Sequence, residues 1–89
     1  MRTLSRTSQF KKDAKRNKRR GKNPEKLKEV VERLLRGEEL ESGYKDHVLQ
    51  GQYATLRECH IEPDWLLLYK VSEKELILIR TGTHADLFE

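Results

Sequence analysis

The sequence has one cysteine, Cys59, and therefore lacks the disulfides that hold many small secreted proteins together. Only 35% of its 89 residues are apolar, whereas 38% are charged. A chain of this length buries only about 60–65% of the surface that its unfolded form exposes. We therefore expect one domain, residues 1–89, with a thin core that a bound partner would help to stabilise.

Long apolar runs are also missing. The longest unbroken apolar segment is residues 65–69, whereas a membrane-spanning helix needs about 20 residues. The first ten residues, MRTLSRTSQF, contain no apolar stretch suited to a signal peptide. We expect a cytoplasmic protein that does not associate with a membrane.

Metal-binding patterns are scarce as well. The histidines and the one cysteine show neither CxxC nor HxxxH spacing, which zinc sites commonly use. We expect no metal site and no cofactor. Cys59 is interpreted as a small buried residue on the back of its strand.

Positive charge is concentrated at one end of the chain. Residues 1–28 carry twelve Lys and Arg against two acids, whereas residues 29–89 carry seven against thirteen. This asymmetry indicates a polyanionic partner, either a nucleic acid or an acidic protein segment, although a solvated helix face without a ligand would look the same. An RNA backbone would be held by the cations of the first helix, which are Lys11, Lys12, Lys15, Arg16, Arg19 and Arg20.

Two helices are predicted in the N-terminal part. The first covers residues 8–20 and has a weak apolar stripe, formed by Phe10 and Ala14. Asn23 is suited to cap the second helix, and Gly37 follows its end. The second helix has apolar residues at the spacing of a core-facing stripe: Leu27, Val30, Val31, Leu34 and Leu35. The short connection between the helices predicts an antiparallel hairpin.

Strand signals follow a polar segment, residues 38–53, that we interpret as mainly loop. Three strands are predicted after it, at residues 55–61, 65–71 and 75–81. The second and third are apolar on both faces, as is typical of strands covered on both sides. A short strand at residues 2–6 would pair at an edge. The predicted fold class is α+β, with an N-terminal helical hairpin packed on a small antiparallel sheet.

The three histidines lie beside predicted turns or strand ends: His47, His60 and His84. Alternate side chains of a strand share a face, so Glu58 and His60 should project together while Cys59 points away. Asp64 lies at a hairpin turn, and Arg80 ends the third strand shortly before His84. We expect these groups to converge at one end of the sheet.

Such a group suits the cleavage of RNA, which carries its own nucleophile in the 2′-hydroxyl. The reaction needs a base, an acid for the departing 5′-oxygen and cations for the phosphate oxygens. Histidine serves in either proton-transfer role near neutral pH, and Arg80 could stabilise the developing charge. Trp65 and Tyr69 are interpreted as core residues. Phe88 could either anchor the end of the chain or stack on a base.

Three segments that contain these residues, YKDHVLQG, LRECHIEPDWLLLYK and LILIRTGTHADLF, resemble the YafQ branch of the RelE/ParE toxin superfamily. They cover most of residues 44–88 in the order and spacing of that family. Residues 1–37 are similar only in general character, as a basic helical hairpin. The resemblance implies a ribosome-dependent endoribonuclease of a toxin–antitoxin module that cuts messenger RNA in the ribosomal A site. It also implies a cognate antitoxin, and binding of operator DNA only through the antitoxin complex.

The same resemblance assigns functional positions to His47, His60, Asp64, Arg80, His84 and Phe88. It implies that His84 is the general acid and that His47 or Asp64 is the base. His60 would position the phosphate or share the proton transfers, Arg80 would stabilise charge and Phe88 would contact a base. Glu58 stands where some relatives have aspartate, and it is placed at the edge of the site.

Two other functions remain compatible with the sequence. One is a superfamily member that poisons a protein, as the gyrase-directed toxins do, although those relatives generally lack the histidine set. The other is a nucleic-acid-binding module without catalysis, in which the basic helix carries the whole function. We also expect an antitoxin to bind this domain through an acidic, mostly helical segment. Its expected binding surface is the basic N-terminal helix and the neighbouring sheet surface.

Overall fold

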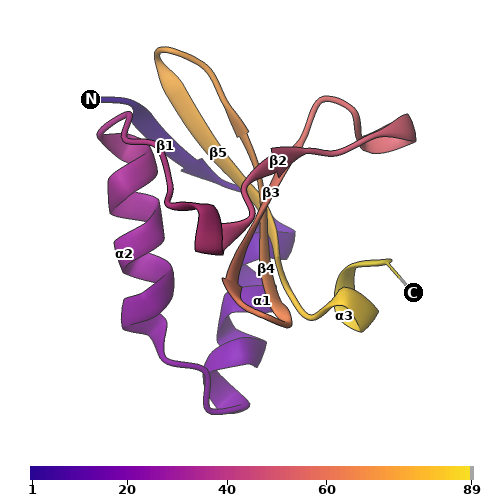
Figure 1. Cartoon of the computed structure of the whole chain (residues 1–89). Coiled ribbons are helices and arrows are strands. Elements are labelled where there is room, and N and C mark those ends of the chain that lie inside the picture. The colour runs from indigo at the N-terminus through magenta and orange to yellow at the C-terminus, as the bar shows by residue number, and fades with distance from the viewer. Residues whose placement is uncertain (89) are drawn as a thin grey trace.

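The fold consists of helices on both sides of one sheet (Figure 1). It is taken from a computed structural model that describes residues 1–88, without the side chain of Tyr53. Helices α1 (Ser8–Arg19) and α2 (Pro24–Leu35) form a hairpin on one side, and the short helix α3 (His84–Phe88) lies on the other. The described strands are β1 (Thr3–Arg6), β2 (His47–Val48), β3 (Arg57–Glu62), β4 (Trp65–Val71) and β5 (Glu75–Gly82), in the spatial order β1-β5-β4-β3-β2. Two 3₁₀ turns, η1 (Ser42–Tyr44) and η2 (Gly51–Tyr53), flank β2.

The predicted α+β class is confirmed, with corrections in detail. The sheet is mixed, because β1 pairs in parallel with β5 while the other pairs are antiparallel. In the chain, the helical hairpin follows β1 and precedes the other strands. This long connection across the sheet allows β1 to pair in parallel with β5. The predicted loop at residues 38–53 contains β2. Helix α3 was not predicted.

Local sequence explains both ends of the helical hairpin. The Thr7 hydroxyl accepts a hydrogen bond from the Phe10 N–H at 2.9 Å and caps α1. The Asn23 side chain caps α2 in the same way, with Pro24 in the first turn. Gly21 follows α1 with a positive φ of 89°, a conformation in which a side chain would be strained. No helix in the described part of the chain is long and apolar enough to cross a membrane.

The side chains of β4 divide the core into two layers. Leu67 and Tyr69 face the helical hairpin and pack with residues of α1 and α2, Phe10 and Val30 among them. The intervening Leu66 and Leu68 face the other side, where Leu87 of α3 packs on them. The prediction that Trp65 and Tyr69 are core residues is confirmed, because they are 2% and 1% exposed. Cys59 is also buried, and its burial raises its pKa to about 12.

Buried polar side chains complete the docking of α1, which has few apolar ones. Strand β1 covers the edge of β5 only as far as Leu78. Beyond it, the Thr81 N–H donates to Asp13 at 3.2 Å and the Thr81 carbonyl accepts from Asn17 at 3.2 Å. Asp13 and Asn17 are 1% and 2% exposed. Two side chains one helical turn apart thus replace a neighbouring strand at this edge.

The carboxylate of Asp13 is fully used in this contact. It also accepts from Arg80 through Nε at 3.0 Å and Nη2 at 3.1 Å, and from Gln9 at 3.0 Å. Burial by itself would raise the pKa of Asp13, but the hydrogen bonds, led by the one from Arg80, lower it. Asp13 is therefore an ionised group that ties α1 to β5.

We predict that Asp13→Ala lowers the free energy of unfolding by about 1–3 kcal/mol, because it leaves a buried backbone N–H without an acceptor. Urea unfolding followed by circular dichroism would measure this change. Lys12→Ala, at the exposed neighbouring position, serves as the control and should stay within about 0.5 kcal/mol of the wild type. Equal effects of the two substitutions would contradict this role of Asp13.

Candidate active site

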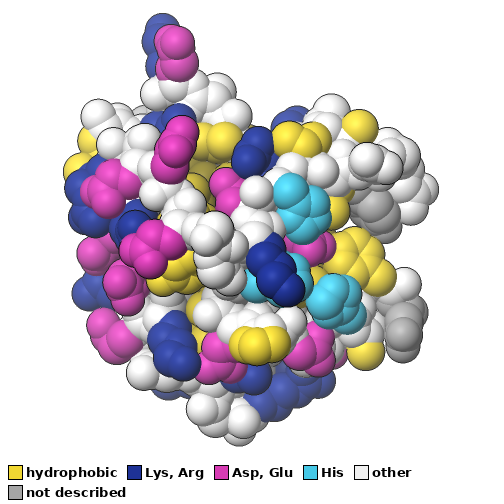
Figure 2. Space-filling model, in the orientation of Figure 1, with side chains coloured by type: hydrophobic (Ala, Val, Ile, Leu, Met, Phe, Trp, Pro, Cys, Tyr) yellow, Lys and Arg dark blue, Asp and Glu magenta, His cyan; other side chains and the backbone are white. Residues whose placement is uncertain are grey.

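The histidines gather on the face of the sheet opposite the helical hairpin (Figure 2). The pairing of strands explains this position. His47 lies opposite Glu58, Glu58 opposite Leu68, and Leu68 opposite Arg80, so these residues form one row across four strands. His60 lies in the next row, opposite Leu66. Leu66 and Leu68 form the apolar floor of the face.

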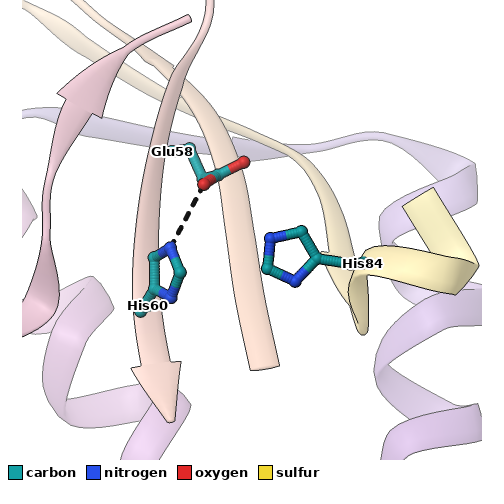
Figure 3. Close-up of side chains that lie close together, drawn as sticks. All are labelled: Glu58, His60 and His84. Atoms are coloured by element: carbon teal, nitrogen blue, oxygen red, sulfur yellow. Dashed lines mark ion pairs between the residues drawn. The ribbon is translucent and has the colours of Figure 1, made fainter. Parts of the chain in front are cut away.

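Glu58 lies at the centre of this group, not at its edge as predicted. Its Oε1 is 3.3 Å from His60 Nε2 and 3.6 Å from His47 Nε2. The Glu58 side chain is only 7% exposed, so its carboxylate is covered and has the two imidazoles as neighbours. Figure 3 shows Glu58 and His60 on β3 and His84 at the start of α3, all directed toward the same space. The predicted shared face of Glu58 and His60 is confirmed.

The other ring nitrogens of two histidines contact backbone carbonyls. His60 Nδ1 lies 3.2 Å from the Pro63 carbonyl, and His47 Nδ1 lies 2.6 Å from the Lys45 carbonyl. Because a carbonyl only accepts, each Nδ1 is the donor. Both nitrogens of His60 therefore lie beside oxygen atoms, Nδ1 beside the Pro63 carbonyl and Nε2 beside Glu58.

His84 follows β5 and joins the group at the sheet end that carries His60 and the β3–β4 turn. Its ring centroid is 5.8 Å from that of His60. Both its backbone N–H and its Nδ1 lie 3.0 Å from Oδ1 of Asp64. These hydrogen bonds, the backbone one first, lower the pKa of Asp64. The contact fixes the orientation of the ring and directs Nε2 away from Asp64, as a carboxylate does for a catalytic histidine.

A bulge in β5 determines the position of Arg80. Tyr69 pairs with Leu78, but Leu68 pairs with Arg80, so Ile79 is an extra residue. Without it, Arg80 would follow Leu76 and Leu78 onto the helical face; with it, Arg80 shares the row of Glu58. Bulges often re-aim side chains next to active sites in this way. The spacing of strands places the Cα atoms of Glu58 and Arg80 about 10 Å apart.

Asp86 holds α3, which carries both His84 and Phe88. Its backbone N–H donates to the Thr83 hydroxyl and its carboxylate accepts from the Thr83 N–H, a capping box within the sequence THAD. The same carboxylate binds Arg20 with Nη1–Oδ2 at 2.7 Å and Nη2–Oδ1 at 3.3 Å. Arg20 lowers the pKa of Asp86 to about 2. The Phe88 ring, 40% exposed, lies 6.2 Å from the His84 ring.

The six cations predicted to bind RNA fall into two groups. Arg16 and Arg20 are engaged in ion pairs: Arg16 lies 3.3 Å from Asp13 and 3.7 Å from Asp86, and Arg20 binds Asp86. The other four, Lys11, Lys12, Lys15 and Arg19, are exposed. Charge reversal of Arg16 or Arg20 would therefore disturb α3 as well as the surface charge.

Asp46 positions His47, a role that the sequence analysis did not predict. It accepts hydrogen bonds from the Tyr69 hydroxyl and, at 3.1 Å, from Arg57, so the loop is tied to the sheet directly before His47. Lys45 has a left-handed backbone, with φ 49°, which is uncommon outside glycine and often found at functional sites. Only the capping-box spacing of THAD could have revealed a comparable positioning residue, Asp86, from the sequence.

Three groups of the site could also hold a metal ion. One ligand atom from each of Glu58, His60 and His84 lies within 4.8 Å of the others. Imidazole and carboxylate together suit zinc or copper. The sequence prediction of no metal site rested on spacing along the chain, whereas these ligands come from β3 and α3.

The comparisons with known proteins agree with this geometry. The sequence model for YafQ, a bacterial toxin of a type II toxin–antitoxin system, matches residues 2–89. The chain is 43% identical over 88 residues to mRNA interferase toxin YafQ of Escherichia coli K12, covering 98% of this chain and 96% of that protein. The structure matches the E. coli DinJ–YafQ complex with a TM-score of 0.93 at 42% identity, covering 100% of both chains. It matches a copper-bound mutant toxin from Helicobacter pylori with a TM-score of 0.94 at 40% identity, covering 99% of this chain and 100% of that one.

Fold and site together define a small toxin of the type that an antitoxin neutralises. The chain belongs to the YafQ family of type II toxin–antitoxin toxins, as its resemblance to the YafQ branch predicted.

We predict that Asp86→Asn removes a stabilisation that depends on pH. The pKa of Asp86 is about 2 in the folded state, against about 3.9 for an unfolded aspartate. Its contribution is therefore complete above pH ~4 and is lost as the pH falls toward 2. Urea unfolding between pH 2 and 7 would measure the difference in unfolding free energy between wild type and Asp86→Asn. This difference should be constant above pH ~4 and should shrink as the pH falls from ~4 toward 2. A constant difference would contradict the ion pair with Arg20.

Proposed function

We propose that this chain is a ribosome-dependent endoribonuclease that cleaves messenger RNA in the ribosomal A site. The observation that supports this most strongly is the meeting of His47, His60 and His84 around Glu58 on one face. The E. coli relative is an mRNA interferase, and RNA cleavage is a chemistry that this set of groups can perform. The chain works in the cytoplasm, where its messenger RNA substrate is translated.

The proposed reaction uses the 2′-hydroxyl of the substrate as nucleophile. A base removes its proton, the 2′-oxygen bonds to phosphorus, and the bond from phosphorus to the 5′-oxygen breaks. An acid protonates the departing 5′-oxygen, so the products are a 2′,3′-cyclic phosphate and a 5′-hydroxyl. Each well-placed acid or base contributes about 10²–10⁴-fold. The scheme needs no metal or other cofactor.

We assign the acid to His84. A carboxylate bonded to one nitrogen of an imidazole stabilises its protonated form, and Asp64 is placed to do this for His84. The lowered pKa of Asp64 makes it a weak base, so its role is to orient His84. Of the two candidate bases, we therefore favour His47.

The remaining residues bind the substrate. A protonated His60 would donate to a phosphate oxygen, and Arg80, which Asp13 holds in place, would stabilise the charge that develops on the phosphate. A hydrogen bond joins donor and acceptor at about 3 Å, so two donors up to about 6 Å apart can bind the same phosphate oxygen. One ring nitrogen of His60 and one of His84 lie within 4.8 Å of each other and meet this condition. Phe88 would contact a base. The RNA backbone would be bound in a salt-dependent way by the exposed cations of α1, which are Lys11, Lys12, Lys15 and Arg19. Arg16 and Arg20 would add to the positive electrostatic potential.

The partner that controls this activity is a cognate antitoxin. The structural relative in the DinJ–YafQ complex is bound to one, and the charge of residues 1–28 suits an acidic segment of such a protein. Operator DNA would be bound only by the toxin–antitoxin complex.

We predict that His84→Ala lowers cleavage about 10²–10⁴-fold while the fold survives, because the side chain is 54% exposed. The measurement is the mapping of transcript 5′ ends in cells that express wild type or variant, with circular dichroism as the control for folding. A substrate with deoxyribose just 5′ of the cleaved phosphate should remain intact. Unchanged cleavage of the deoxy substrate would refute the 2′-hydroxyl mechanism.

Two outcomes would favour the other functions. Growth arrest with intact messenger RNA would indicate a protein target. Loss of function on charge reversal of Lys11, Lys12, Lys15 and Arg19, with no effect of the histidine substitutions, would indicate a module that only binds nucleic acid.

We predict that chelators leave cleavage intact and that added copper or zinc inhibits it. The ion would occupy His60 and His84, which must be free to bind the phosphate and to transfer a proton. Initial cleavage rates with EDTA, with Cu²⁺, and with Cu²⁺ followed by EDTA would test this. Loss of activity in EDTA that returns with a divalent ion would contradict the metal-free scheme.

A further inference from the structure

A small apolar pocket lies at the elbow of the helical hairpin, away from the imidazoles. It has a volume of about 200 Å³, enough for one large apolar side chain. The ring of Trp65 closes it from below, and Ala14, Pro24 and Leu27 supply its apolar walls. Ala14 and Leu27 are half-buried, so a partner side chain placed between them would remove further apolar surface from water.

The pocket contains a buried acceptor that has no donor. Asn17 lines it and is 2% exposed. Its Nδ2 donates to the Thr81 carbonyl, but its Oδ1 has no hydrogen-bond partner among the described residues. Buried polar atoms are rarely left unsatisfied in a native protein. Because this oxygen is covered in the free chain, a donor from a bound partner could reach it only after the Asn17 side chain turns toward the pocket.

Lysines surround the pocket. Lys15 and Lys18 of α1 are exposed at its rim. The Lys22 ammonium lies 5.9 Å above the Trp65 ring and forms an ion pair with Glu62 at 3.0 Å. The only acids of residues 1–28 are Asp13 and Glu25, and Asp13 is buried in its contact with β5. The exposed Lys15 and Lys18 therefore attract negative charge, whereas the interior suits an apolar group.

We propose that this pocket is the anchor site for one apolar side chain presented by an acidic segment of the antitoxin. The proposal rests on the proposed function, in which an antitoxin controls the chain. It adds a defined site to the general charge attraction, because the apolar side chain and the flanking acids are two separate requirements. A large apolar group in a closely fitting pocket is the usual centre of a protein interface.

Location favours a protein over RNA as the occupant. Trp65 faces the helical hairpin with Leu67, whereas the imidazoles lie on the other face of the sheet. A strand of RNA whose phosphate lies among the imidazoles does not cross this pocket. The rim nevertheless includes Lys15, one of the cations proposed to bind RNA. Antitoxin bound here would compete for that cation and would weaken RNA binding without covering the histidines.

The sequence provides a direct probe of the site, since Trp65 is its only tryptophan. The full chain labelled with 5-fluorotryptophan should give one ¹⁹F resonance, which reports the surroundings of the pocket floor. The probe is the antitoxin encoded beside this chain, added at natural fluorine abundance. We expect a shifted resonance in the complex.

Ala14→Leu would fill the pocket while keeping a good helix former in α1. It should weaken antitoxin binding at least tenfold, measured by calorimetry, with unchanged RNA cleavage by the free toxin. Ala54→Leu is the matched control, because it makes the same change at an exposed residue outside the pocket, and its affinity should equal that of the wild type. Lys15→Glu with Lys18→Glu should weaken binding more than Lys11→Glu with Lys12→Glu, which changes the charge equally but outside the pocket.

Two results would overturn the proposal. One is antitoxin binding without a change of the ¹⁹F resonance and with equal affinity for Ala14→Leu and Ala54→Leu. The other is loss of RNA cleavage in Ala14→Leu with unchanged antitoxin affinity, which would make the pocket an RNA subsite. Neither result depends on the imidazoles, whereas absence of RNA cleavage by the wild type would refute the proposed function and leave the binding measurement valid.

Discussion

The register of β4 against its two neighbours decides which side chains meet on each face of the sheet. Its pairing with β3 and β5 sends Leu67 toward the helical hairpin and aligns Glu58 with Arg80 on the other side, across Leu68. A slip by one residue would exchange the two faces. The bulge at Ile79 is part of the same constraint, because it moves Arg80 from the helical side to the row of Glu58.

Acidic side chains then connect the strongly cationic α1 to this sheet. Asp13 binds Arg80 and the Thr81 N–H, and Asp86 binds Arg20 from α3. Part of the charge of α1 is therefore used inside the molecule, where it sets the position of α3 and hence of His84. The exposed lysines are left for partners. The same helix can thus support the site on one face of the sheet and carry a binding surface on the other.

Much of the fold could be predicted from periodicity and capping residues, because α2 and β4 have strong apolar patterns and Asn23 and Gly37 mark helix ends. The residues of the site could be predicted by resemblance, and their shared face by strand alternation for Glu58 and His60. The central place of Glu58 could not be predicted, because it depends on the position of His47 beside β3. That position is fixed by the contacts of Asp46 with Arg57 and Tyr69. Nor could the pairing of Arg16 and Arg20 with acids be predicted, since those acids are distant in the chain. The parallel β1–β5 pair was missed for the same reason, whereas α3 is five residues long and is marked in the sequence only by the capping box of THAD.

The central claim is that imidazoles from three distant segments act on one phosphodiester at the face opposite the helical hairpin. Its most direct test is a structure of the chain on a ribosome whose messenger RNA carries deoxyribose at the cleaved position. The account predicts the scissile phosphate within hydrogen-bond distance of His60 and His84, with Glu58 behind them. A phosphate held by α1, with the imidazoles facing solvent, would contradict it.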